Sequence, residues 1–413
     1  MKLLRRMGWV FAALGLHPAA AQTYFPPVPA ASAPWETVDP AALGWCPEAV
    51  EALHAFADST GSRALLVLHG GRIAVEGYYN GHGPDSAWYW ASAGKSVMAA
   101  LCARAMAEGD LTPSTAVSSL LGPGWSSASA PTESSITVSH LLTMTSGFYD
   151  GVPDDDCWAP ECLVPLAAPG TRWAYHNAPY HILHEVLPEA TGLSVNFFLN
   201  SRLFAPIGAS GLYVQFANEP WNRVLVSKAR DAARFGLLAA RGWQWNGQYL
   251  IADSSLRAAL TAPSTALNPS YGWLWWLNGG PTHRMPSSQV VFNGPMVPAA
   301  PPDLRMALGR DDQKVWAIPS LDLVVVRLGE NPGYPGLAGF DYNAALWSRL
   351  SAVLLGCCPA DLDGSGTVDV QDLLLFLPGY GCLAGCPADL SGDGAVGSAD
   401  LTLLLAAYGV PCP

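Results

Sequence analysis

The sequence predicts an α/β (α+β) domain with an antiparallel sheet flanked by helices, followed by a second, much smaller domain. Three observations lead to this. Hairpin patterns occur near both ends of the first 356 residues, helices and long loops fill most of the chain between them, and the last 57 residues contain a 28-residue repeat. Strands at both ends with helices between them indicate one sheet assembled from both ends of the chain.

Composition limits the classes of protein to which the chain can belong. Its 413 residues, 50% of them hydrophobic, suffice for two or three domains with a large core. With 13% charged residues and a formal net charge of −12, the chain is unsuited to binding nucleic acid or anionic lipid. Seven of the negative charges and five of the nine cysteines lie in the last 57 residues, which indicates that this segment is a separate domain.

The N-terminus predicts a secretory signal peptide over residues 1–21. Lys2, Arg5 and Arg6 precede the short apolar run Met7–Leu16, and three alanines offer a cleavage site before Gln22. No later stretch is apolar enough to span a bilayer, so we expect no transmembrane segment. We therefore expect a secreted, periplasmic or cell-surface protein in which disulfides can form. Residues 22–45, rich in Pro and Ala, predict an extended leader.

Each element of the main domain, predicted over 46–356, follows from a local pattern. Apolar residues at helical spacing predict the first and last helices, and short apolar runs around tight turns predict the strands of two hairpins. In chain order these elements are the helix 47–58, the strands 64–68 and 72–78, the strands 314–318 and 323–327, and the helix 344–355.

Ser92 and Lys95 form an S-x-x-K pattern at the predicted start of a helix that continues through Met98–Met106. Residues three apart share one face of a helix, so Lys95 can hydrogen-bond to the Ser92 hydroxyl. A serine needs a neighbouring base to become a nucleophile, and a lysine serves when burial and positive neighbours lower its pKa. The helix N-terminus adds backbone N–H groups for an oxyanion. A capping serine beside a surface lysine would give the same letters.

Four further stretches accompany this pattern in a fixed order: 136–148, 169–177 with Tyr175-His-Asn177, 271–276, and 309–329. With Ser92 and Lys95 they resemble the serine β-lactamase and penicillin-binding superfamily over residues 45–355. The chain is most similar to class C-like β-lactamase-related hydrolases, which include esterases and aminohexanoate-oligomer hydrolases. The resemblance implies a β-lactamase/transpeptidase-like fold.

The resemblance also implies a role for each site residue. Ser92 would be the acylated nucleophile, Lys95 its base partner, and Tyr175 a proton shuttle. Asn177 would orient the substrate or Lys95. The oxyanion hole would use the backbone N–H groups of Ser92 and of Arg310, which follows Gly309. The implied activity is hydrolysis of a small ester or amide through an acyl-enzyme, with no cofactor for catalysis.

One departure from the family pattern bears on the substrate. Where many β-lactamases carry a K-T-G triad, this chain has Ala307-Leu308-Gly309, without the lysine and threonine that grip a β-lactam carboxylate. We therefore expect an esterase or amidase acting on a small, fairly neutral acyl group rather than on antibiotics. Two alternatives stay open: a D-amino-acid peptidase or amidase on cell-wall fragments, and a non-catalytic surface binding protein on the same fold.

A loop between these motifs carries acidic residues that could rim the pocket, and a solvated acidic turn would look the same. It contains Tyr149, Asp150 and residues 154–156, and Cys157 and Cys162 could close it as a small disulfide loop. His181, His184 and Glu185 share a predicted helix, but the second histidine of H-E-x-x-H is missing, so we expect no zinc site.

The tail repeat predicts calcium loops. Its first copy places Asp361, Asp363, Ser365, Thr367, Asp369 and Asp372 at positions 1, 3, 5, 7, 9 and 12 of an EF-hand pattern, with glycine at position 6. The second copy offers Asp389, Ser391, Asp393, Ala395 and Asp400 but has no side-chain ligand at position 9. We expect Ca²⁺ in both loops, bound more weakly in the second.

The two loop–helix copies over 357–413 resemble a type I dockerin-like module. The resemblance implies docking onto a cohesin-like or surface partner. Pro378 should end the first helix early. Disulfides joining Cys358 to Cys382 and Cys386 to Cys412 would close each copy, and Cys357 could pair with Cys46. Cys102 is expected to be a buried free thiol.

Overall fold

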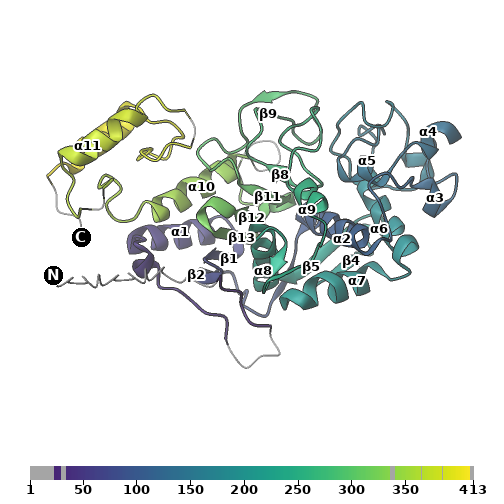
Figure 1. Cartoon of the computed structure of the whole chain (residues 1–413), viewed down its shortest axis with the longest axis horizontal. Helices are drawn as coiled ribbons and strands as arrows, with labels where there is room; N and C mark the ends of the chain where they lie inside the picture. The colour runs from purple at the N-terminus through teal and green to yellow at the C-terminus, as the bar shows by residue number, and fades with distance from the viewer. Residues whose placement is uncertain (1–22, 29–33, 335–339, 364, 384, 410–413) are drawn as a thin grey trace, which may run out of the picture.

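The computed structural model describes residues 23–28, 34–334, 340–363, 365–383 and 385–409. The predicted signal peptide and Cys412 lie outside these residues. The predicted fold class is confirmed: helices flank an antiparallel sheet (Figure 1). No helix in the described part of the chain is long and apolar enough to cross a membrane.

The central sheet unites both ends of the main domain, as predicted. Its six strands follow the order β2-β1-β13-β12-β11-β8, and each pairs antiparallel with its neighbours. The strands are β1 (Ser62–His69), β2 (Arg72–Tyr78), β8 (Trp276–Leu277), β11 (Arg305–Gly309), β12 (Gln313–Ile318) and β13 (Leu323–Gly329). Every residue of β12 and β13 is buried, so both faces of the sheet are covered there.

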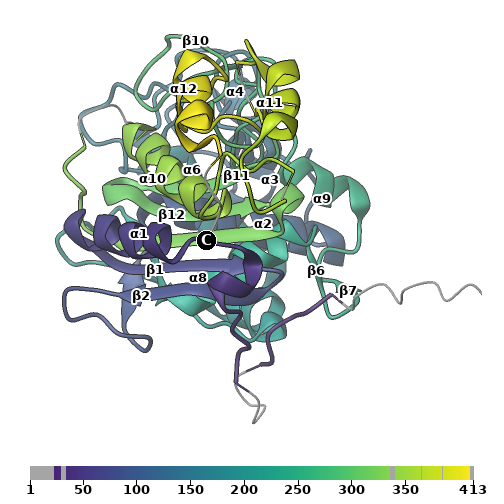
Figure 2. The ribbon, with the colours of Figure 1, turned by 90° about the vertical axis from the view of Figure 1, so that its left-hand side faces the viewer.

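Helices provide that cover. α1 (Pro47–Ser59) and α10 (Phe340–Leu354) pack together beside the sheet, and α8 (Ala229–Ala240) packs on β1, β12 and β13 (Figure 2). Gly236 allows the close approach of α8, because a Cβ atom there would lie 2.5 Å from Val324 and 2.9 Å from Val315. The predicted first and last helices of the domain are thereby confirmed.

The middle of the chain forms short helices and small sheets around α2 (Gly94–Glu108). The remaining elements of this part are α3 (Ser118–Leu121), α4 (Ala130–Ser134), α5 (Val138–Leu142), α6 (Asn177–Thr191), α7 (Val195–Phe198) and α9 (Ser254–Leu260), the sheet β3 (Ala87–Tyr89), β5 (Arg223–Lys228) and β4 (Leu212–Gln215), and the pairs β6 (Gln244–Trp245) with β7 (Gln248–Tyr249) and β9 (Thr282–His283) with β10 (Phe292–Asn293).

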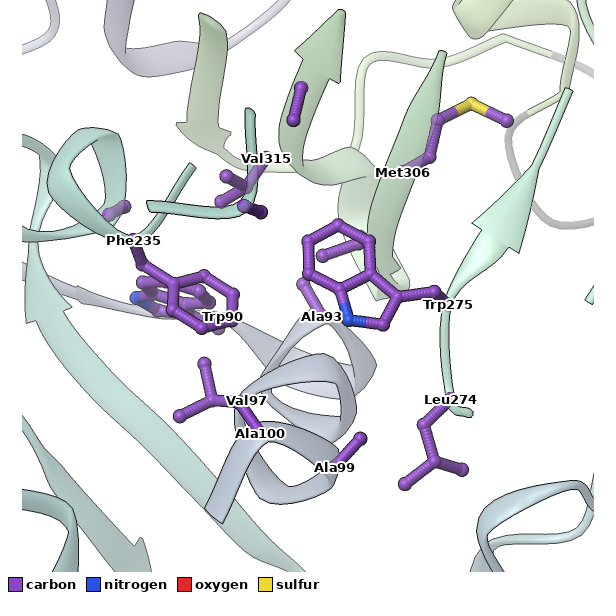
Figure 3. Packing of buried hydrophobic residues seen from close by; sticks show 14 of the residues in the cluster. Trp90, Ala93, Val97, Ala99, Ala100, Phe235, Leu274, Trp275, Met306 and Val315 are labelled. Carbon is purple, nitrogen blue, oxygen red and sulfur yellow. The ribbon is translucent and has the colours of Figure 1, made fainter. Parts of the chain in front are cut away.

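α2 is buried on nearly all sides, which suits a helix that carries catalytic groups. Its small and branched residues Val97, Ala99 and Ala100 pack beneath the rings of Trp90 and Trp275 (Figure 3). Trp275 does not belong to an extended aromatic strand over 271–276, as the family resemblance suggests. Only Trp276 enters β8, because the left-handed backbone of Leu274 (φ 55°) breaks the strand before it.

The tail has a small core of its own, separate from the main core. Val368, Phe376, Val396 and Leu404 are its most buried side chains. Its helices are α11 (Val370–Phe376) and α12 (Ser398–Ala407). The predicted early end of the first helix is confirmed, since α11 gives way to a 3₁₀ turn that contains Pro378.

The cysteines follow the predictions in part. Cys157 and Cys162 form the predicted disulfide, and Cys102 is buried and free, as predicted. In the tail, Cys382 is joined to Cys386, four residues away; the predicted pair of Cys358 with Cys382 stays a prediction, and the predicted partner of Cys386, Cys412, lies outside the described residues. Cys46 and Cys357 are not bonded, although both thiols lie near the Glu48 carboxylate.

Candidate active site

Ser92 lies in a 3₁₀ turn (Ala91–Ala93) that links β3 to α2. The turn begins with Ala91 in the left-handed region (φ 46°), a conformation that costs free energy for a residue with a Cβ atom and often marks functional sites. Lys95 follows in the first turn of α2, and its Nζ donates a hydrogen bond of 3.0 Å to Ser92 Oγ. The predicted serine–lysine pair is therefore formed.

Burial makes Lys95 an unusual lysine. Its side chain is 4% exposed, and this desolvation lowers its pKa to about 8, while the Asp156 and Asp155 carboxylates oppose the shift. The ammonium lies 5.2 Å from the ring centre of Tyr175 and 4.5 Å from that of Tyr180. About a tenth of Lys95 is therefore uncharged at pH 7 and able to accept a proton, and this fraction grows as the pH rises.

Tyr175 and Asn177 flank the start of α6 and complete the predicted group. Burial raises the pKa of Tyr175, a hydrogen bond with Ser92 partly offsets that shift, and the ring stacks on Trp276 with 5.5 Å between centroids. Asn177 Nδ2 donates a 3.0 Å hydrogen bond to Asp155 Oδ2. Residues more than 80 positions apart thus meet at one hydroxyl.

Gly309 brings the end of β11 against the serine turn. A Cβ atom at this position would lie 2.2 Å from the Trp90 carbonyl oxygen and 3.0 Å from Ala93 N. Only glycine permits this approach, which places the next residue, Arg310, on the wall of the catalytic cavity. The predicted pair Gly309 and Arg310 is therefore beside Ser92.

The turn after Arg310 is stabilised by contacts that no sequence motif predicts. Asp311 and Asp312 both have left-handed backbones (φ 58° and 60°). Tyr89 donates a 2.6 Å hydrogen bond to Asp311 Oδ2, and Lys314 Nζ lies 2.7 Å from Asp312 Oδ1 in a buried ion pair. Adjacent acidic residues in a loop carry no sequence signal for such a conformation.

Two adjoining cavities, about 400 and 410 Å³ in volume, meet at the serine. Ser92, Asn177, Arg310 and Asp311 line both of them. Lys95, Asp156 and Glu219 line the first, and Asp155, Tyr175 and Trp276 line the second. The site therefore offers space on two sides of the nucleophile, as cleavage of a bond between two groups requires.

The acidic loop supplies two side chains to these cavities. Asp156 lies 3.4 Å from His181 Nε2, and Asp155 accepts a 2.7 Å hydrogen bond from Ala178 N through its backbone carbonyl. Asp150 instead pairs with Arg172, and Tyr149 is 44% exposed. The sequence left open whether this loop rims the pocket or is a solvated turn, and it did not distinguish the two carboxylates that line the cavities from their neighbours.

Two groups of carboxylates in the tail could each hold a cation. Carboxylate oxygens of Asp361, Asp363 and Asp372 lie within 4.8 Å of one another, as do those of Asp389, Asp393 and Asp400. These hard oxygen donors suit Ca²⁺. Of the other predicted ligands, Asp369 instead caps α11 by accepting a 2.7 Å hydrogen bond from Gln371 N. The other predicted ligands contact their own loops. In the first loop, the Ser365 hydroxyl donates to the Thr367 carbonyl. In the second, the Ser391 hydroxyl donates to the Asp389 carboxylate, and Ala395 N donates to that of Asp393.

The histidines of α6 form no metal site with Glu185. His184 Nε2 lies 3.1 Å from the Tyr180 hydroxyl, and Glu185 pairs with Arg223. Burial lowers the pKa of His181 to about 4, so its imidazole is neutral. Within the described residues, neither histidine belongs to a group of three potential metal ligands.

The fold and this site define a member of a family of serine hydrolases. The Ser92 hydroxyl contacts a buried lysine and a tyrosine, and it lies beside the strand end that Gly309 brings close. Nucleophilic catalysis by a serine needs such a neighbouring base. The chain belongs to the beta-lactamase family, whose family model matches residues 51–329.

Individual relatives agree with this family at low identity. A Bacillus subtilis protein assigned as a penicillin-binding protein is 25% identical over 177 residues, covering 39% of this chain and 44% of the relative. Penicillin-binding protein 4 of Amycolatopsis lactamdurans is 29% identical over 134 residues, covering 30% of this chain and 35% of the relative. The chain thus spans less than half the length of these curated relatives.

Solved structures show the same fold. A Bacteroides dorei protein assigned as a beta-lactamase has a TM-score of 0.58 at 16% identity, covering 74% of this chain and 97% of its own. A Bacillus anthracis protein assigned as a 6-aminohexanoate-dimer hydrolase has a TM-score of 0.53 at 18% identity, covering 73% of this chain and 81% of its own. At these identities the similarity concerns the fold alone.

Proposed function

We propose that the chain hydrolyses an ester or amide of a small acyl group through a covalent acyl-enzyme on Ser92. The observation that carries this proposal is the 3.0 Å hydrogen bond between Lys95 Nζ and Ser92 Oγ in a buried site. Because burial lowers the pKa of Lys95 to about 8, the lysine can take the hydroxyl proton as the oxygen attacks the substrate carbonyl.

The other site residues have distinct roles in this mechanism. The backbone N–H groups of Ser92 and Arg310 receive the oxyanion that forms on the carbonyl oxygen. Tyr175, which is hydrogen-bonded to the Ser92 hydroxyl, passes a proton to the leaving group as the bond between the leaving group and the acyl carbon breaks. Asn177 orients the substrate. Water then attacks the acyl-enzyme, and the same groups return the proton to Ser92.

The strand beside the site favours an ester or amide over a β-lactam. Ala307 and Leu308 are buried in β11, so this part of the strand offers neither a cation nor a hydroxyl to a substrate carboxylate. The grip that the K-T-G triad supplies in many β-lactamases is therefore missing from this wall of the cavity.

Turnover by site variants tests the assignment. Ser92→Ala should lower kcat for 4-nitrophenyl butyrate by a factor of about 10⁴ or more, and Lys95→Met by about 10² to 10⁴. Ser59→Ala, an exposed serine in α1, is the control and should leave turnover unchanged. D-alanyl peptides and aminohexanoate dimer, assayed beside the ester, separate esterase from peptidase or amidase. Turnover retained by Ser92→Ala would refute the nucleophile.

We further propose that residues 357–413 form a dockerin-like module that binds Ca²⁺ and tethers an exported hydrolase, residues 46–356, to a cohesin-like or surface partner. Three features support this: the 28-residue repeat, the two converging carboxylate groups and the separate small core. The signal peptide predicted over 1–21 supports export.

A further inference from the structure

We infer that the substrate carries a primary ammonium group near the scissile carbonyl and that Asp155 and Asp156 receive it. The inference rests on the proposed acylation of Ser92 and names the substrate class of that reaction. It departs from the fairly neutral acyl group suggested by the missing K-T-G triad, because the charges that face the cavity come from other elements.

The two carboxylates lie in the walls of the catalytic cavities. Asp156 lines the cavity that contains Lys95, and Asp155 lines the cavity that contains Tyr175. Asn177 lines both cavities, as does Ser92. A group bound beside the nucleophile therefore meets a carboxylate in either cavity.

No cation of the protein pairs with these carboxylates. Among the residues that the structure describes, no lysine or arginine forms an ion pair with either one. Asp156 has a neutral imidazole, His181, at 3.4 Å, and Asp155 has the Asn177 amide at 3.0 Å. The charges of Lys95 and Arg310 act on both carboxylates from beyond ion-pair distance, and the charge of Lys95 is lost when it acts as the base.

Asn177 provides independent evidence that this wall can accept a hydrogen bond from a ligand. Its Nδ2 donates to Asp155, and because a carboxylate only accepts, this contact fixes which end of the amide is which. Asn177 Oδ1 is the other end, buried and without a hydrogen-bond partner. A buried acceptor without a partner is costly, and a bound donor would remove that cost.

The wall thus presents three acceptor groups, Asp155, Asp156 and Asn177 Oδ1, of which the two carboxylates carry a negative charge. A primary ammonium carries three N–H donors and one positive charge, whereas a neutral alkyl group carries neither. On charge and on hydrogen-bonding capacity, an ammonium is the ligand that complements this wall.

The wall is also fixed in place, as a binding site requires. The Asp155 carbonyl accepts a hydrogen bond from Ala178 N at the start of α6, and the Cys157–Cys162 disulfide closes the loop directly after Asp156. Both carboxylates are therefore held at the cavity without needing a ligand to order them.

Two phosphonate probes of equal size test the inference. In 3-aminopropyl and butyl fluorophosphonate, Ser92 Oγ forms a bond to phosphorus, the P–F bond breaks, fluoride leaves, and Lys95 takes the serine proton. The aminopropyl probe should label the wild-type protein at least about tenfold faster than the butyl probe. That ratio should fall toward one in Asp156→Asn and in Asp155→Asn.

Asp110→Asn is the control, since Asp110 is exposed after α2 and lines neither cavity; its ratio should match the wild type. Equal or slower labelling of the wild type by the aminopropyl probe would overturn the inference, and this comparison needs no variant to fold. A ratio unchanged in both folded carboxylate variants would overturn it too. Absence of labelling by either probe would refute the acylation of Ser92 itself.

Discussion

At the residue scale, Lys95 decides whether the serine can react. A lysine in water is almost fully protonated at neutral pH, whereas burial lowers the pKa of Lys95 to about 8. The carboxylates of Asp155 and Asp156 limit this shift. Lys95 therefore changes between its charged and neutral forms around pH 8.

This environment predicts the pH dependence of acylation. Lys95 must be neutral to accept the Ser92 proton, so kcat/KM should rise with pH between about 6 and 9, with a midpoint near 8. Tyr175 does not cancel this rise, because burial raises its pKa and keeps the phenol protonated. The measurement is kcat/KM for 4-nitrophenyl butyrate across this range. A flat profile, or a midpoint near that of an ordinary lysine, would contradict the assigned base.

Sequence reasoning reached the candidate site residues by two routes. Ser92 and Lys95 are three apart, which places both on one face of a helix, whereas Tyr175 and Asn177 were identified by their resemblance to a family motif. It could not single out Asp155 or Asp311, because what distinguishes them is a tertiary contact. Asp155 meets Asn177, and Asp311 meets Tyr89, which is 222 positions away.

At the element scale, the site depends on how closely β11 passes the turn that carries Ser92. Gly309 makes this contact possible, because any side chain there would overlap the Trp90 carbonyl. In the proposed mechanism, the strand end and the serine turn supply the two backbone N–H groups of the oxyanion hole. The fit between the two elements is therefore part of the catalytic apparatus.

Gly309→Ala tests this fit. The added methyl group must push β11 away from the serine turn, and a shift of about 1 Å costs on the order of 10²-fold in rate, so kcat should fall by about that factor. Gly83→Ala is the matched control, since its Cβ atom would meet only Ser86 Oγ, at 3.9 Å. Ester turnover and thermal melting, measured together, separate misplacement from unfolding. Full activity in Gly309→Ala would contradict the proposed oxyanion site.

The hairpins and the first and last helices were predictable because their patterns are local and strongly apolar. The segment 271–276 was not, because its tryptophans are spaced as in a strand while the backbone turns at Leu274. The turn is stabilised by tertiary packing, because it allows Trp275 to be buried beside α2 (Figure 3). Packing outweighs local β propensity here.

At the scale of the whole molecule, the negative charge is divided unequally. Seven of the twelve net negative charges belong to the tail, and six of those seven aspartates converge in two groups. Repulsion within each group disfavours the compact tail unless a cation neutralises it. The tail's stability should therefore depend on calcium, while the hydrolase has its own core.

Calorimetry of the full chain tests this division. Calcium should raise the temperature of the tail's unfolding transition, and EDTA should lower it, with ester turnover unchanged by either. Asp372→Ala should weaken the response to calcium, because Asp372 is buried within the first group. Asp341→Ala, an exposed aspartate of α10, removes the same charge and should not. Turnover lost on chelation would contradict the independence of the two parts.

The central claim is that the chain acts through an acyl-enzyme on Ser92. The most direct measurement is mass spectrometry of the protein quenched with acid during turnover of a slowly hydrolysed ester, followed by peptide mapping. We predict one added acyl group, located on the peptide that contains Ser92 and absent from Ser92→Ala. Turnover without any adduct, or an adduct on another residue, would contradict the account.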